Sequence, residues 1–231
     1  MKKIYSRIMK SAAAIALTLF TATGAKAQYY ELVNQIPSLI SPALSGAATY
    51  RGYVDATATF GVGDDRANFV GISTTQGYRF TSWFFMGAGI GVDVAMSSTN
   101  DVPLTGNYQP DPGYYYRSVA RTKAMIPIFS DFRFNFGNQN GTSFFADIKA
   151  GATWLIGSSY LEVNNGALST RAQFLLRPTI GVRIPANSQK PRQAFNIGLT
   201  YQLITANNTW GWINDYDTTL NSLGISAGFE W

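Results

Sequence analysis

The chain of 231 residues contains neither cysteine nor histidine, which excludes disulfides, thiolate metal sites and the commonest general base of enzymes. The formal net charge of +5 does not indicate a nucleic-acid partner, because five of the 18 basic residues and none of the 13 acidic residues lie in the first 27. Without that segment the chain has 13 residues of each sign and is neutral, so we expect no nucleic acid among its partners.

The first predicted element is a cleaved secretory leader over residues 1–27. Four basic residues precede the apolar run 12–20, and the small-residue site Ala25-Lys26-Ala27 follows it. The apolar run is too short to span a bilayer as a helix, and no cysteine follows the site, so neither a membrane anchor nor a lipoprotein is indicated. We expect cleavage near Ala27 and a mature chain that begins at Gln28.

Residues 28–47 form an apolar segment before the first predicted strand, with the sequence Ile36-Pro37-Ser38-Leu39-Ile40 near its middle. This composition predicts a short helix, or a periplasmic lid that plugs the mouth of the domain that follows. Residues 48–231 contain no linker-like stretch or break in composition, so we predict one domain there.

Strands fill that domain, because period-two alternation recurs along it and no window shows a 3.6-residue apolar period. In the last strand Leu223, Ile225, Ala227, Phe229 and Trp231 alternate with Gly224, Ser226, Gly228 and Glu230. The predicted strands cover residues 50–61, 68–80, 84–96, 124–136, 144–156, 172–184, 195–203 and 220–231.

An even number of strands, each with an apolar and a charged face, predicts an all-β fold: an eight-stranded antiparallel transmembrane β-barrel. The connections after the second, fourth and sixth strands are short, whereas 97–122, the connection after the fifth strand and 204–218 are longer or rich in turn residues. We therefore expect short turns and both termini on the periplasmic side, and long loops outside the cell.

A soluble β-sandwich or lipocalin-like barrel is the structural alternative, with the apolar faces turned inward. The aromatic content, 15 Phe, 13 Tyr and 5 Trp, argues against it, because many of these residues fall near strand ends, where membrane barrels carry aromatic girdles. Phe85 and Phe145 belong to this set. The predicted interface aromatics are Trp83, Phe84, Phe144, Trp154, Phe229 and Trp231.

If the apolar faces meet lipid, five acids and seven bases lie in the lumen. We expect a salt-bridged plug, because charges removed from water need partners; an anion-leaning pore is the alternative. Asp131-x-Arg133 and Asp147-x-Lys149, on adjacent strands, predict a cross-strand network. The predicted lumen residues are Arg51, Asp55, Arg79, Asp93, Asp131, Arg133, Asp147, Lys149, Arg171, Arg177, Arg183 and Glu230.

Other motifs carry little chemistry. Gly87-Ala88-Gly89-Ile90-Gly91 lacks the spacing of a nucleotide-binding loop, and its glycines are expected to make room for large lumen side chains. Loop carboxylates show no organised ligand spacing, so we expect no metal and no cofactor. Pro127 and Pro178 fall inside predicted strands and indicate bulges or strand ends there.

The leader, the alternating segments, the aromatic C-terminus and three phrases together resemble a family. The phrases are Gly77-Tyr78-Arg79-Phe80, Ile128-Phe129-Ser130-Asp131-Phe132-Arg133 and Phe144-Phe145-Ala146-Asp147-Ile148-Lys149-Ala150-Gly151. The chain resembles the small outer-membrane barrels of OmpA-barrel or OmpX type in Gram-negative bacteria, particularly the porin-like single-domain barrels of Bacteroides-like bacteria. The resemblance implies residence in the outer membrane, contact with its lipid, and insertion by the barrel assembly machinery, which reads the terminal strand.

Three classes of function remain. In the first, a structural or interaction barrel contacts an extracellular or membrane-protein partner through loop residues Tyr114, Tyr115, Tyr116, Trp210 and Trp212. In the second, the barrel is a narrow porin for small solutes or ions, although side chains fill a barrel of this size. The third, an enzyme, is not expected, because the enzymatic barrels of similar size use a histidine that this chain lacks.

Overall fold

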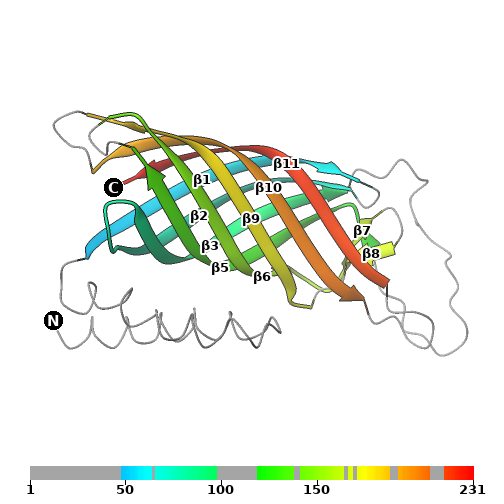
Figure 1. Ribbon diagram of the computed structural model, residues 1–231. Helices are drawn as coiled ribbons and strands as arrows, with labels where there is room; N and C mark the ends of the chain where they lie inside the picture. The colour runs from blue at the N-terminus through cyan, green and yellow to red at the C-terminus, as the bar shows by residue number, and fades with distance from the viewer. Residues whose placement is uncertain are drawn as a thin grey trace, which may run out of the picture.

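The computed structural model describes residues 48–63, 66–97, 119–137, 141–163, 166–168, 171–187, 192–208 and 216–231. Eight long strands in this part form a closed antiparallel barrel in the order β1-β11-β10-β9-β6-β5-β3-β2 (Figure 1). The prediction of an all-β, eight-stranded barrel is confirmed. The strands are β1 (Thr49–Val62), β2 (Ala67–Arg79), β3 (Phe84–Ser97), β5 (Thr122–Phe136), β6 (Ser143–Leu155), β9 (Gln173–Pro185), β10 (Ala194–Asn208) and β11 (Tyr216–Glu230).

The barrel closes where the last strand meets the first. Gly52 and Trp231 exchange two backbone hydrogen bonds of 3.1 and 3.0 Å, which begin the β1–β11 ladder. Gly52 is needed there, because a Cβ atom at this position would lie 2.4 Å from the Trp231 indole. The C-terminal aromatic residue thus lies across the first strand.

The hairpin between β10 and β11 is longer than the sequence predicts. The register pairs Asn208 with Tyr216, so residues 204–208 and 216–218 belong to strands and not to a loop over 204–218. Close to the turn, residues 207–208 and 217–218 are all polar, so the alternation of apolar and polar residues that identifies the rest of both strands is absent from them.

Both prolines lie inside strands without a bulge, contrary to prediction. Pro127 pairs with Thr153 on one side, and the register between β5 and β3 is the same before and after it. Pro178 pairs with Ile148 and likewise leaves the register of β9 and β10 unchanged. Each proline interrupts the ladder on one side only, and Thr200 Oγ1 donates a 3.3 Å hydrogen bond to the Pro178 carbonyl.

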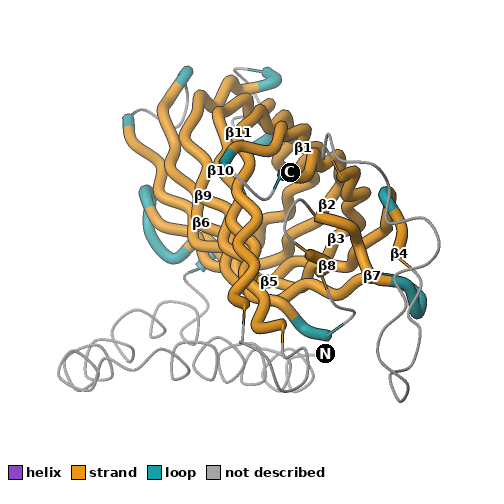
Figure 2. Tube along the Cα trace, turned by 90° about the vertical axis from the view of Figure 1, so that its right-hand side faces the viewer, coloured by secondary structure: helices purple, strands orange, loops and turns teal. Residues whose placement is uncertain are grey.

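Three short strands that the sequence did not predict form a second sheet, in the order β4-β7-β8. They are β4 (Val119–Ala120), β7 (Tyr160–Val163) and β8 (Gly166–Leu168), and segments of this length show no usable alternation. β7 and β8 lie at the end of the barrel opposite the C-terminus, and Figure 2 views that end (Figures 1 and 2). We call it the loop end; the terminal end is where β1 begins and β11 finishes.

The described part of the chain contains no helix that is long and apolar enough to span a membrane.

Candidate functional site: the charged lumen

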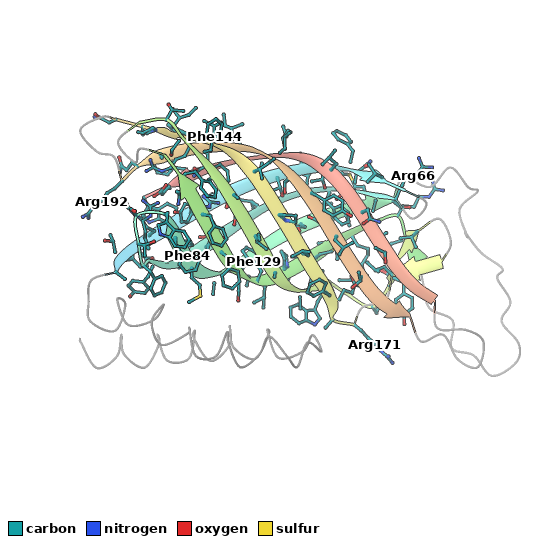
Figure 3. The ribbon with its side chains drawn as sticks, in the orientation of Figure 1. Arg66, Phe84, Phe129, Phe144, Arg171 and Arg192 are labelled. Atoms are coloured by element: carbon teal, nitrogen blue, oxygen red, sulfur yellow. The ribbon has the colours of Figure 1, made fainter. Side chains whose placement is uncertain are left out.

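Side chains of alternate residues point into the barrel. Glycines on the walls make room for the largest of them: a Cβ at Gly89 would lie 2.4 Å from the Phe129 ring, and one at Gly87 would lie 2.8 Å from Phe85. The expectation that these glycines accommodate large lumen side chains is confirmed for Gly87 and Gly89. It is wrong for Gly91, where a Cβ would meet the Ile72 carbonyl oxygen and Ser73 instead. Figure 3 shows Phe129 within the barrel and Phe144 pointing away from it.

At the terminal end, three arginines surround one carboxylate. Glu230 is fully buried, and its Oε1 lies 2.7 Å from Arg79 Nη2 and 3.6 Å from Arg51 Nε. Its Oε2 accepts a 2.7 Å hydrogen bond from Arg183 Nε. Arg51 also donates to the Arg192 carbonyl at 3.2 Å. Four strands, β1, β2, β9 and β11, are tied together by this group, which we call the Glu230 group.

Midway along the barrel lies a second group, the central cluster, made of Asp55, Asp131, Arg133, Asp147 and Lys149. The β5–β6 register places Asp131 opposite Lys149 and Arg133 opposite Asp147. Arg133 Nη2 lies 2.9 Å from Asp147 and 3.6 Å from Asp55. Lys149 Nζ lies 3.2 Å from Asp55 and 3.9 Å from Asp131, and it donates a hydrogen bond to Asp147. All five side chains are buried.

A third ion pair lies nearer the loop end. Arg177 of β9 binds Asp93 of β3 across the lumen, and its Nε donates a 2.8 Å hydrogen bond to Gln202 of β10. Gln202 is uncharged and is therefore not among the predicted lumen residues. Eleven of the twelve predicted lumen charges are thus buried inside the barrel, in three groups along its length.

Arg171 is the twelfth, and its predicted place in the lumen is wrong. β9 begins at Gln173, two residues later, so Arg171 lies outside the wall and is exposed at the loop end (Figure 3). The predicted start of this strand at residue 172 was one residue early, and the alternation was extended beyond it.

Aromatic rings line the lumen between the ion pairs. Tyr53, Phe85, Phe129 and Phe145 are all buried, and the Arg133 guanidinium lies between Tyr53 and Phe145. Phe85 and Phe145 were expected at the membrane interface and lie in the lumen instead. Phe85 is the register partner of Arg133, and Phe145 lies two residues before Asp147 on the same strand face. The odd–even position of a residue in its strand, its parity, therefore places both rings in the lumen, whereas their nearness to strand ends suggested the membrane interface.

Four of the six predicted interface aromatics, Trp83, Phe144, Trp154 and Trp231, are exposed. Phe84 also has the parity of the outer face, but it is 7% exposed because Phe80, Trp83 and Phe134 pack around it. Phe229 is half-buried against Phe195, with ring centroids 5.2 Å apart.

An apolar cluster lies in the lumen at the loop end, among buried polar residues such as Thr153, and the sequence did not predict it. Inward residues of the wall, among them Phe69, Met125 and Ile204, pack with Leu161, Val163 and Leu168 of the β7–β8 hairpin in one buried cluster. Lys123 Nζ donates a 2.9 Å hydrogen bond to Ser159 at the root of the hairpin. The alternation within each strand marks the inward positions, but only the fold shows that the hairpin covers them.

Several predicted features lie outside the described residues. These are the leader 1–27, the whole segment 28–47 with its proposed lid, and the loop aromatics Tyr114, Tyr115, Tyr116, Trp210 and Trp212. The described residues contain no group of three or more acidic side chains arranged to hold a metal ion.

The outer face of the barrel is apolar where the lumen is charged. Leu199 and Ile225, at mid-strand, are 61% and 60% exposed, whereas Arg133, Arg177 and Arg183 in the lumen are each 1% exposed. A soluble sandwich or lipocalin-like barrel has the opposite arrangement, so that alternative is wrong. A closed barrel also leaves no strand edge unpaired, as a wall in contact with lipid requires. The fold and its faces are those of a transmembrane β-barrel.

No known protein family matches the sequence, and no curated protein sequence matches it. Solved structures of similar fold include Neisserial surface protein A, at 14% identity and a TM-score of 0.49 over 79% of this chain and 97% of that one. They also include the outer-membrane enzyme PagL, at 14% identity and a TM-score of 0.43 over 76% and 97% of the two chains. The outer-membrane protein OprG from Pseudomonas aeruginosa has 11% identity and a TM-score of 0.40 over 80% and 97%.

Proposed function

We propose that the protein is an integral outer-membrane barrel with a structural or surface-interaction role, and that its lumen does not conduct. The burial of the lumen arginines carries the proposal. Arg133, Arg177 and Arg183, each 1% exposed, lie in three separate ion-paired groups, and the apolar cluster with the β7–β8 hairpin lies beyond them. An ion that crosses the barrel must disturb all of these layers.

The orientation and partners are part of the same proposal. Both ends of the barrel domain lie together, and we assign the terminal end to the periplasm, with leader cleavage near Ala27 and residues 28–47 as a lid on that side. The C-terminal alternation ending at Trp231 supports recognition by the barrel assembly machinery. Contact with an extracellular or membrane-protein partner is assigned to the loop residues Tyr114 and Trp210 and their aromatic neighbours, on their sequence alone. We also propose membership of the porin-like barrels of Bacteroides-like bacteria, on the three phrases given above, and no catalytic role.

The test is single-channel recording of the protein purified from outer membranes of cells that express the full chain. We expect a silent bilayer although the protein is inserted, with insertion verified by protection of the barrel from added protease. Discrete conductance steps would contradict the closed lumen.

A narrow porin is the second candidate, and one observation favours it. Buried polar atoms of Asn135, Ser143 and Asn196 have no hydrogen-bond partner among the described residues, and such groups in a polar lumen bind water. If steps appear in the recording, the porin predicts that Arg177→Gln or Arg183→Gln changes their ion selectivity, whereas leaks around the barrel remain unselective.

The assignments at the N-terminus have their own tests. Sequencing the N-terminus of the outer-membrane protein should give Gln28; retention of residues 1–27 would contradict the leader. Deletion of residues 28–47 should lower the stability of the barrel or open a conductance, and a variant unchanged in both would contradict the lid.

A further inference from the structure

The central cluster contains one more acid than base. Asp55, Asp131 and Asp147 meet only Arg133 and Lys149 in the ion pairs that join them. All five residues are at most 3% exposed. A buried carboxylate without a counter-charge costs several kcal/mol in order of magnitude, so the group needs one further positive charge.

Asp131 is the carboxyl group least supported as an anion. It is fully buried, and neither of its oxygens accepts a hydrogen bond from the described residues. Its nearest cation, Lys149, is 3.9 Å away and lies closer to the other two acids. On the opposite side its register partner is Gly87, and the rings of Phe85 and Phe129 occupy the space above Gly87 and Gly89. Apolar groups of this kind favour the uncharged form of a carboxyl group.

We propose that the central cluster binds one proton, held by Asp131 and shared with Asp147, so that the five residues are neutral together. The diagonal position of the two residues on adjacent strands is within side-chain reach. Asp147 Oδ1 has no donor among the described residues and would accept the Asp131 O–H. The proton comes from solvent during folding, and no bond other than the O–H forms or breaks. This inference goes beyond the proposed function, because it requires the barrel interior but not a closed channel.

The other charged and titratable groups around Asp131 do not supply the missing charge. Arg133 of β5 pairs with Asp147 and Asp55, and the Tyr53 hydroxyl of β1 accepts a 3.3 Å hydrogen bond from Arg79. Arg177 of β9 is the register partner of Lys149 but binds Asp93. A metal ion is disfavoured, since no three acids among the described residues converge as metal ligands. A proton is the remaining positive charge that fits a fully buried site.

Infrared absorption of the purified protein in an ester-free detergent, in D2O at neutral pD, tests the proposal. A protonated carboxyl group absorbs apart from an ionised one. We expect the wild-type protein to show one protonated carboxyl group that Asp131→Asn lacks. The amide band of the same spectra reports whether the β-sheet is intact, so a variant that does not fold is recognised at once.

Charge counting gives further variants with different expected results. Asp55→Asn leaves two acids and two bases in the cluster and should also abolish the protonated band, although it does not alter Asp131. Lys149→Met leaves three acids with one base and should add a second protonated carboxyl group. Asp93→Asn is the matched control, because it removes a buried lumen acid outside the cluster and should leave the band unchanged.

Three outcomes would overturn the proposal. One is equal absorption of the wild-type protein and Asp131→Asn. Another is an Asp93→Asn variant that loses the band as fully as Asp131→Asn does. The third is a wild-type band that appears only when sodium is replaced by choline, since a bound metal cation would then supply the charge.

Discussion

The guanidinium carbon of Arg133 lies 4.0 Å from the centroid of the Tyr53 ring, inside the barrel and away from water. Phe145 faces the same cation at 4.9 Å, so the charge lies between two aromatic rings. Tyr53 also contacts Phe85 edge-on, at 4.8 Å between centroids, and its hydroxyl accepts a hydrogen bond from Arg79. Tyr53 therefore joins the Glu230 group to the central cluster, and the lumen is one connected structure over these two groups.

Removal of the Tyr53 ring should destabilise the barrel more than removal of its hydroxyl. Tyr53→Ala loses the contacts with Arg133 and Phe85 and leaves a cavity, and we expect a loss of about 3–5 kcal/mol in the free energy of unfolding. Tyr53→Phe keeps the ring and should cost only about 1 kcal/mol. Urea unfolding in lipid vesicles, followed by tryptophan fluorescence, measures both. Equal losses would show that the hydrogen bond to Arg79 dominates over the stacking on Arg133.

Arg133 and Asp147 should show strong energetic coupling, because they lie 2.9 Å apart and both are buried. Arg133→Met leaves buried carboxylates without their cation and should cost about 3–5 kcal/mol. Asp147→Asn in the same chain restores part of that loss, and a double-mutant cycle should give a coupling energy of about 1–3 kcal/mol. Additive losses in the unfolding experiment would mean that the pair is replaced by water or by other partners in the variants.

The alternation of the sequence was sufficient to place most lumen charges, because a strand has only two faces and one of them meets lipid. Parity alone assigns Asp131, Arg133 and Asp147 to the same face. Parity fails at Arg171, because β9 begins only at Gln173. Residues outside a strand do not alternate between two faces, so parity cannot place them. Parity also assigns Phe85 and Phe145 to the lumen, where both are buried. The expectation that aromatic residues near strand ends lie at the membrane interface placed them on the outer face, which is wrong.

Contacts between residues far apart in the chain could not be predicted from the sequence, for a different reason. The partner of Asp93 is Arg177, 84 positions along the chain, and the choice depends on how the strands are staggered around the closed barrel. The β7–β8 hairpin covers the apolar lumen positions without any local pattern that predicts it. Pro127 and Pro178 were expected to distort their strands, but each lacks a donor on one side only, and the neighbouring pairs keep the register.

Gly89 should tolerate no side chain, because a Cβ there would lie 2.4 Å from the Phe129 ring. Gly89→Ala forces the ring to move within a filled lumen, and we expect a loss of about 1–3 kcal/mol. Gly141→Ala is the matched control, since nothing lies within 4 Å of its added Cβ, and it should change stability by less than about 0.5 kcal/mol. Phe129→Leu in the Gly89→Ala background should recover part of the loss; if it does not, backbone contact with Thr74 is the cause.

The outer face should reject charge according to depth. Leu199 lies near the middle of β10 and is 61% exposed, whereas Phe60 lies near the loop end of β1 and is 70% exposed. In water both substitutions to arginine would be nearly neutral, because both side chains are already exposed. In a bilayer Leu199→Arg should cost about 2–4 kcal/mol and Phe60→Arg only about 0–1 kcal/mol. Folding free energies in vesicles give both values, and the difference between them separates a lipid-facing wall from a water-facing one. Equal, near-zero costs at the two positions would contradict a membrane-spanning barrel, whereas an equal, large cost at both would place Phe60 deeper in the bilayer than its position near the end of β1 indicates.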